Sequence, residues 1–205
     1  MSKPIVFLGN GGHASVLYDV VSKQGTDIVA TVSEKTPQSD SLFSQFENYN
    51  DDGFRFEFKP NDVELVNGIG FMPFTDIRQR IYQKYKNLGY KFASVIDNSS
   101  TVSPSAKLGE GVQLLMGSIV QANAKLGDNS IVNTGVIVEH DCNIGNHCHL
   151  APRSLLCGHV DIQDNVFIGA GSTIKNNLLI AESSVVGMGS KVLRNVAQSE
   201  VYFNN

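Results

Sequence analysis

The stretch LGDNSIVNTGVIVEHDCNIGNHCHL, Leu126 to Leu150, carries an aliphatic residue at every sixth position. The same register runs from Ile96 to Val192, and all seventeen first positions of this series are Ile, Leu or Val. The fifth position of most hexads is small, and the fourth is often Gly or Asn, which tolerate the left-handed backbone of a tight corner. This hexapeptide repetition predicts a parallel β-helix whose first and fifth residues fill the interior.

The repeat pattern [LIV]-G-x-x-[small]-x resembles the hexapeptide-repeat acyltransferase superfamily from Ile96 to Val196. The resemblance implies that three hexads form one triangular coil of about eighteen residues. It also implies that the coils wind left-handed, against the usual rule for crossover connections. Seventeen hexads then give just under six coils.

Residues 1–95 follow a different pattern, in which short apolar runs alternate with helical ones. This alternation predicts a small Rossmann-like α/β domain with a parallel sheet, so that the chain divides into domains 1–95 and 96–205. Residues 34–61 are polar, contain Pro and Asn, and are predicted to form an irregular loop. The expected strands are 4–10, 27–33 and 63–71, and the expected helices are 13–25 and 75–89.

Composition narrows the class of protein and its partners. The net charge is −4 and there is no long basic run, so nucleic acid is not an expected partner. No apolar stretch approaches the ~20 residues of a membrane-spanning helix, and we expect no membrane partner. The three cysteines are an odd number, and the N-terminus shows no signal-peptide pattern; both favour a reducing cytoplasm.

The segment VEHDCNIGNHCHL, residues 138–150, collects three histidines and two cysteines. In the hexad register Cys142 and Cys148 take fifth positions and point inward, whereas the histidines lie outside or at corners. Thiols and imidazoles therefore cannot share one metal ion, and we predict no metal ligand. A histidine-only zinc site stays open as an alternative, because the gamma-class carbonic anhydrases also use a left-handed β-helix; its donors would be His140, His147, His149 and His159.

A histidine base is the other interpretation. His140 and His149 are nine residues apart, half of an eighteen-residue coil, so they project from opposite sides of one subunit. They can meet only across an interface, which predicts a cyclic oligomer, most naturally a trimer. Gly158 lies eighteen residues after His140, one coil above it, and offers a backbone N–H. A base beside an N–H donor suits attack on a thioester.

Three segments, residues 8–21, 133–152 and 157–174, resemble one branch of the superfamily, the nucleotide-sugar N-acetyltransferases and sialic-acid O-acetyltransferases. The resemblance implies acetyl-CoA as co-substrate, a nucleotide-linked amino sugar as acceptor, a homotrimer and direct transfer. It implies His140 as the base and Asp141 as its acidic neighbour. It further implies acetyl-CoA contacts at His149, Gly158, Ala170 and Met188, and substrate contacts at Gly11, Gly12, His13 and Glu34.

We therefore predict N-acetylation of a nucleotide-linked 4-amino-4,6-dideoxyhexose for bacterial surface glycans such as O-antigen. O-acetylation of a sialic acid, the zinc hydratase and a non-catalytic sugar-nucleotide-binding module stay open. The segment GNGGHA, residues 9–14, also fits the dinucleotide fingerprint G-x-G-x-x-A, which leaves NAD binding as a further possibility. Relatives carry a shorter turn where this chain has the insertion Phe71 to Phe74, beside the expected sugar pocket.

Overall fold

The computed structural model describes residues 3–204. The chain divides into two compact units, with the boundary in the sequence between Val95 and Ile96. The N-terminal unit is α/β and the C-terminal unit is a parallel β-helix, so the predicted fold class is confirmed. Every helix among the described residues is too short or too polar to cross a lipid bilayer.

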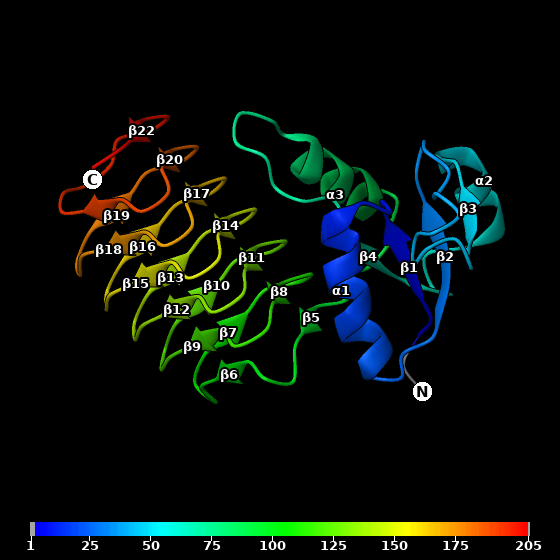
Figure 1. The fold of residues 1–205 in the computed structure, drawn as a ribbon, viewed down its shortest axis with the longest axis horizontal. Helices are drawn as coiled ribbons and strands as arrows, with labels where there is room; N and C mark the ends of the chain where they lie inside the picture. The colour runs from blue at the N-terminus through cyan, green and yellow to red at the C-terminus, as the bar shows by residue number, and fades with distance from the viewer. Residues whose placement is uncertain (1–2, 205) are drawn as a thin grey trace. The chain divides into compact units, whose positions relative to one another are not determined.

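The N-terminal unit is built on a four-stranded parallel sheet with the order β3-β2-β1-β4. All four residues of β1 are buried, as expected for a parallel strand covered on both faces. Figure 1 shows the sheet together with its helices. The strands are β1 Ile5–Leu8, β2 Ile28–Val32, β3 Glu47–Tyr49 and β4 Glu64–Asn67; the helices are α1 Gly12–Lys23, α2 Asp51–Glu57 and α3 Ile77–Asn87.

Gly68 allows the end of β4 to pack closely against α1. A Cβ atom at this position would lie 2.8 Å from the Cβ of Ala14 and 2.9 Å from the carbonyl oxygen of Leu8. Both distances are far below normal van der Waals contact, so only glycine fits without displacing the backbone. This close approach holds the carboxyl ends of β1 and β4 against α1.

The prediction of an irregular loop over residues 34–61 is wrong in two places, because the segment contains β3 and α2. Strand β3 extends the sheet by pairing with β2. Helix α2 is capped by Asn50, whose Oδ1 accepts the N–H of Gly53 at 2.8 Å, and is anchored by the fully buried Phe54. Elements of three and seven residues carry too little periodicity to stand out from a polar background.

The C-terminal unit stacks its short strands into three parallel sheets of seven, six and five strands. Neighbouring strands of a sheet are eighteen residues apart, as Ile131 is from Gln113 and His149; the last pair, β20 with β22, is sixteen residues apart. The seven-stranded sheet contains β5 Val95–Ile96, β8 Gln113–Leu114, β11 Ile131–Val132, β14 His149–Leu150, β17 Phe167–Ile168, β20 Val185–Val186 and β22 Val201–Tyr202.

The chain turns a corner after each strand and enters the next sheet, so that one coil takes a strand from each sheet (Figure 1). The six-stranded sheet contains β6 Thr101–Val102, β9 Ile119–Val120, β12 Ile137–Val138, β15 Leu155–Leu156, β18 Thr173–Ile174 and β21 Lys191–Val192. The five-stranded sheet contains β7 Lys107–Leu108, β10 Lys125–Leu126, β13 Asn143–Ile144, β16 Asp161–Ile162 and β19 Leu179–Ile180.

The aliphatic first residues of the hexads fill the interior of the coils. Thirteen successive ones, from Val120 to Val192, are at most 4% exposed. Cys142 and Cys148 lie between them, buried as predicted. Burial raises the pKa of Cys142 to about 11 and that of Cys148 to about 12, which leaves both thiols protonated and inert at neutral pH.

Candidate active site

His140 and Asp141 occupy the corner between β12 and β13, on the outside of the β-helix. The imidazole is 55% exposed, and its Nδ1 lies 2.9 Å from Oδ2 of Asp141. Hydrogen bonds from His140 and from Asn123, whose Nδ2 lies 3.1 Å from Oδ1, hold the pKa of Asp141 below its ordinary value. An ionised carboxylate requires a proton on Nδ1, so Nε2 of His140 carries the lone pair of a base.

Gly158 lies directly beside the His140 ring, one coil further along. A Cβ atom at Gly158 would be 2.6 Å from Cε1 and 2.7 Å from Nε2 of the imidazole. Any other residue would therefore collide with the ring. The backbone N–H of Gly158 has no hydrogen-bond partner among residues 3–204, which leaves it available as a donor close to the base.

His159 lies beside His140 in the β-helix. The sequence assigned it no catalytic or binding role beyond the zinc alternative. Its Nε2 lies 3.6 Å from the same Oδ2 of Asp141, and its ring meets that of His140 edge to face with centroids 5.4 Å apart. The spacing of the two histidines could have predicted this contact. They are nineteen residues apart, which is one coil of eighteen residues plus one position along the same corner. His140, Asp141 and His159 thus form one cluster.

His149 lies on strand β14 of the seven-stranded sheet, away from the corner of His140. The ring is half-buried, and its Nε2 lies 3.1 Å from Nδ2 of Asn133. It packs nearly perpendicular to the Phe167 ring, with centroids 5.3 Å apart. One chain does not bring His140 and His149 together, because they lie on a corner and on the sheet opposite to it.

His147 takes a corner conformation with φ of 57°, but the expectation that it faces outside is wrong. Its side chain is buried, and Nδ1 lies 3.0 Å from Nδ2 of Asn129 in the coil below. A polar corner residue can stack inward on its equivalent in the next coil, which the hexad register alone does not reveal.

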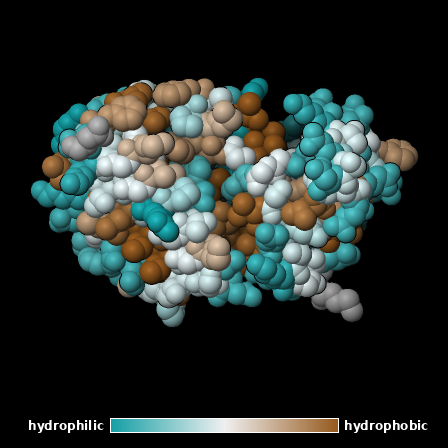
Figure 2. Space-filling model, viewed as in Figure 1, coloured by the Kyte–Doolittle hydropathy of each residue, from teal (hydrophilic) through white to brown (hydrophobic). Residues whose placement is uncertain are grey.

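Ala170 and Met188 follow β17 and β20, at the corner between the seven- and six-stranded sheets. They lie one coil apart, and the carbonyl of Ala170 accepts the N–H of Gly189 at 2.8 Å. Met188 is 75% exposed. Figure 2 shows exposed hydrophobic side chains (brown) interspersed with hydrophilic ones over the surface. This corner is not that of His140 and Gly158, although the two corners border the same six-stranded sheet.

The N-terminal unit has a pocket of about 600 Å³ at the carboxyl ends of its parallel strands. This edge is where open α/β sheets bind ligands. Glu34 lines the pocket, as do apolar side chains including Val32 and Ile81. Gly11 is the N-cap of α1 and Gly12 its first residue, and a Cβ atom at either position would meet open space. Neither they nor His13 are among the residues that line the pocket.

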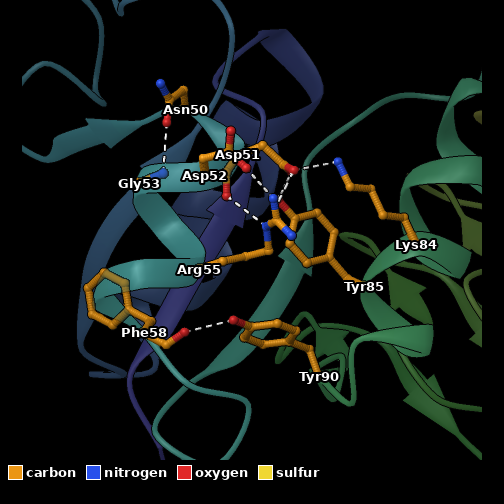
Figure 3. Close-up of polar contacts among 9 residues, drawn as sticks. All are labelled: Asn50, Asp51, Asp52, Gly53, Arg55, Phe58, Lys84, Tyr85 and Tyr90. Atoms are coloured by element: carbon orange, nitrogen blue, oxygen red, sulfur yellow. Dashed lines mark hydrogen bonds and ion pairs between the residues drawn. The ribbon is translucent and has the colours of Figure 1, made fainter.

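One wall of this pocket is a polar cluster that the sequence reasoning missed (Figure 3). Asp51 from α2 accepts hydrogen bonds from Lys84 Nζ at 2.5 Å and from the Tyr85 hydroxyl at 2.6 Å, both from α3. Burial works to raise the pKa of Asp51, yet these two hydrogen bonds outweigh it and lower the pKa. The pocket therefore carries fixed charges at one side and apolar surface at the other.

Two family models match the chain. Residues 4–85 match the PglD N-terminal domain, and residues 141–176 match the bacterial transferase hexapeptide of six repeats. A comparison with curated protein sequences gave no match.

Solved structures match nearly the whole chain. PerB from Caulobacter crescentus, in complex with CoA and GDP-perosamine, is 31% identical, with 96% of this chain and 91% of that one covered and a TM-score of 0.84. The acetyltransferase domain of PglB from Neisseria gonorrhoeae is 25% identical, with 96% and 94% covered and a TM-score of 0.86. WeeI from Acinetobacter baumannii has the same fold, with a TM-score of 0.84. It is 21% identical, with 97% of this chain and 95% of that one covered.

Proposed function

Because the chain belongs to the hexapeptide-repeat, left-handed β-helix family of nucleotide-sugar acetyltransferases, we propose that its co-substrate is acetyl-CoA and its acceptor a nucleotide-linked 4-amino-4,6-dideoxyhexose. The product would be the 4-acetamido sugar, made for bacterial surface glycans such as O-antigen and lipopolysaccharide. The similar PerB structure contains CoA and GDP-perosamine, and a structure of the similar PglB domain contains acetyl coenzyme A. These ligands support the proposal of both substrates.

The single observation that carries the proposal is the packing of the His140 ring on Gly158, with Asp141 on its far nitrogen. Asp141 holds the proton on Nδ1, so Nε2 accepts a proton from the attacking amine. The new C–N bond forms as the thioester carbonyl oxygen becomes negative, and the Gly158 N–H donates a hydrogen bond to that oxygen. The C–S bond then breaks, and the imidazolium returns its proton to the departing thiolate.

Direct transfer is preferred because we find no cysteine among residues 3–204 that is suited to act as a nucleophile. Among the described residues Cys142 and Cys148 are buried, with raised pKa values. Cys157 is half-buried, and we assign it no catalytic role. A covalent acyl-enzyme would need an exposed thiolate beside the base.

We infer a homotrimer in the cytoplasm whose acetyl-transfer sites lie between subunits. His140, Asp141 and Gly158 of one subunit would face His149 and the Ala170–Met188 corner of the next, since these groups lie on different sides of one chain. The nucleotide would bind at the pocket of the N-terminal unit, with Glu34 near the base or ribose. Gly11, Gly12 and His13 at the start of α1 would hold the phosphates.

The test measures CoA release with a panel of GDP-, UDP- and dTDP-linked 4-amino sugars and with their 4-hydroxy analogues. We expect turnover of an amine and none of the hydroxyl analogue; the reverse pattern would replace this function by sugar O-acetylation. His140→Ala should lower kcat by about 10²–10⁴, with KM nearly unchanged. A kcat close to that of the parent would remove His140 from the mechanism.

A further inference from the structure

We propose that His140, Asp141 and His159 form a binding site for a divalent transition-metal ion such as Zn²⁺, and that the bound ion inhibits acetyl transfer. The three side chains offer two imidazole nitrogens and one carboxylate oxygen, the donors that Zn²⁺ prefers outside cysteine sites. The site differs from the histidine-only set considered in the sequence, because it replaces His147 and His149 by Asp141.

The spacing of the donor atoms fits one small ion. All three lie within 4.8 Å of one another. The Oδ2 of Asp141 is 2.9 Å from Nδ1 of His140 and 3.6 Å from Nε2 of His159. Ligands bonded to zinc at ~2.0–2.2 Å in a tetrahedron lie about 3.3–3.6 Å apart, so one of these separations already fits and the other is short by a few tenths of an ångström. Small rotations of exposed side chains suffice to close the set around an ion.

The backbone holds these donors on adjacent coils. The N–H of His159 donates to the carbonyl of His140 at 3.1 Å, and both Asp141 and His159 have a φ of 59° at equivalent corners. Asn123 donates to the other oxygen of Asp141 and so orients the carboxylate from outside the ligand set. The site therefore requires no change in fold to bind an ion.

The bound ion inhibits acetyl transfer because it bonds to Nδ1 of the His140 imidazole. Nδ1 of His140 faces Asp141 and carries the proton in the free enzyme. An ion that bonds to Nδ1 takes that lone pair, and the proton of the neutral imidazole moves to Nε2. The ring then has no lone pair left for the attacking amine. This consequence rests on the proposed role of His140 as the base, whereas the binding itself does not.

The experiment titrates the metal-free protein with Co²⁺ and with Zn²⁺. Co²⁺ binding is followed by its visible absorption in the absence of acetyl-CoA, and Zn²⁺ inhibition is followed as initial rates in buffered metal. His159→Asn keeps the His140–Asp141 pair but leaves only two ligands. It should weaken metal binding by at least about tenfold and relieve inhibition by the same factor relative to its own metal-free rate.

Cys157→Ser is the matched control, because Cys157 is the only cysteine among the described residues that is not buried, and a thiol is a rival zinc ligand. Its metal affinity should equal that of the parent. Equal affinity of parent and His159→Asn, or loss of binding in Cys157→Ser, would overturn the site. Binding at the site without inhibition would overturn the inhibitory role. If His140→Ala were also fully active, the proposed role of His140 as the base would fail, while metal binding at the site would still stand.

Discussion

Gly158→Ala adds one methyl group beside the His140 ring, and its effect can be worked out from the structure. The new Cβ would lie 2.6 Å from Cε1 and 2.7 Å from Nε2, about 1 Å inside normal carbon contact. The φ of Gly158 lies outside the left-handed range, so alanine fits the backbone. The exposed imidazole is the part that must move, and moving it strains or breaks the hydrogen bond to Asp141.

The magnitude follows from this displacement. A shift of about 1 Å in a reacting group costs about 10²-fold in rate, so kcat should fall by about 10²-fold. The free energy of unfolding should change by less than about 1 kcal/mol, because the displaced ring is at the surface and Gly→Ala also restricts the unfolded chain.

The assay is a double-mutant cycle of CoA release with Gly158→Ala, His140→Ala and the double variant. If alanine acts only by displacing His140, adding it to His140→Ala lowers kcat no further. A Gly158→Ala enzyme with parental kcat would refute the packing argument. A further loss in the double variant would show instead that the backbone N–H of Gly158 is disturbed.

Other predictions concern stability and reactivity. Burial alone would raise the pKa of Asp51, but its hydrogen bonds to Lys84 and Tyr85 lower it, so the ionised carboxylate stabilises the fold above the unfolded pKa of about 3.9. This stabilisation is lost as pH falls through the folded pKa. In Asp51→Asn, the free energy of unfolding in urea should therefore fall less steeply as the pH is lowered. Phe74 has a φ of 66°, so Phe74→Gly should raise the unfolding free energy by about 1 kcal/mol over Phe74→Ala, measured in urea. Cys148, with its pKa raised to about 12, should react with a disulfide reagent only after denaturation.

The β-helix could be predicted almost completely, because its repeat fixes which side chains point inward. The exceptions are at the first coil, where Ile96, Val102 and Leu108 are only partly buried. They follow the same pattern as residues in the middle, but no earlier coil covers them. A repeat therefore predicts whether a side chain points into the coil, but how far it is buried also depends on whether a coil covers it on each side.

The candidate site could be predicted in part. The length of one coil, eighteen residues, correctly predicted that Gly158 lies beside His140. The same spacing places Asp141 and His159 on adjacent coils, but it does not predict the 3.6 Å approach of their side chains, which depends on rotamers. In the N-terminal unit the hydrogen bond between Asp51 of α2 and Lys84 of α3 joins residues thirty-three positions apart, and no local sequence pattern predicts such a contact.

In the proposed trimer, acetyl transfer requires His140 of one subunit and His149 of its neighbour. Subunit complementation tests this requirement. His140→Ala and His149→Ala would each be inactive alone. Co-expressed with different tags and purified as mixed oligomers, they should restore activity at about a quarter of the interfaces, those where both intact histidines meet. Mixed oligomers as inactive as either parent variant would contradict the shared site.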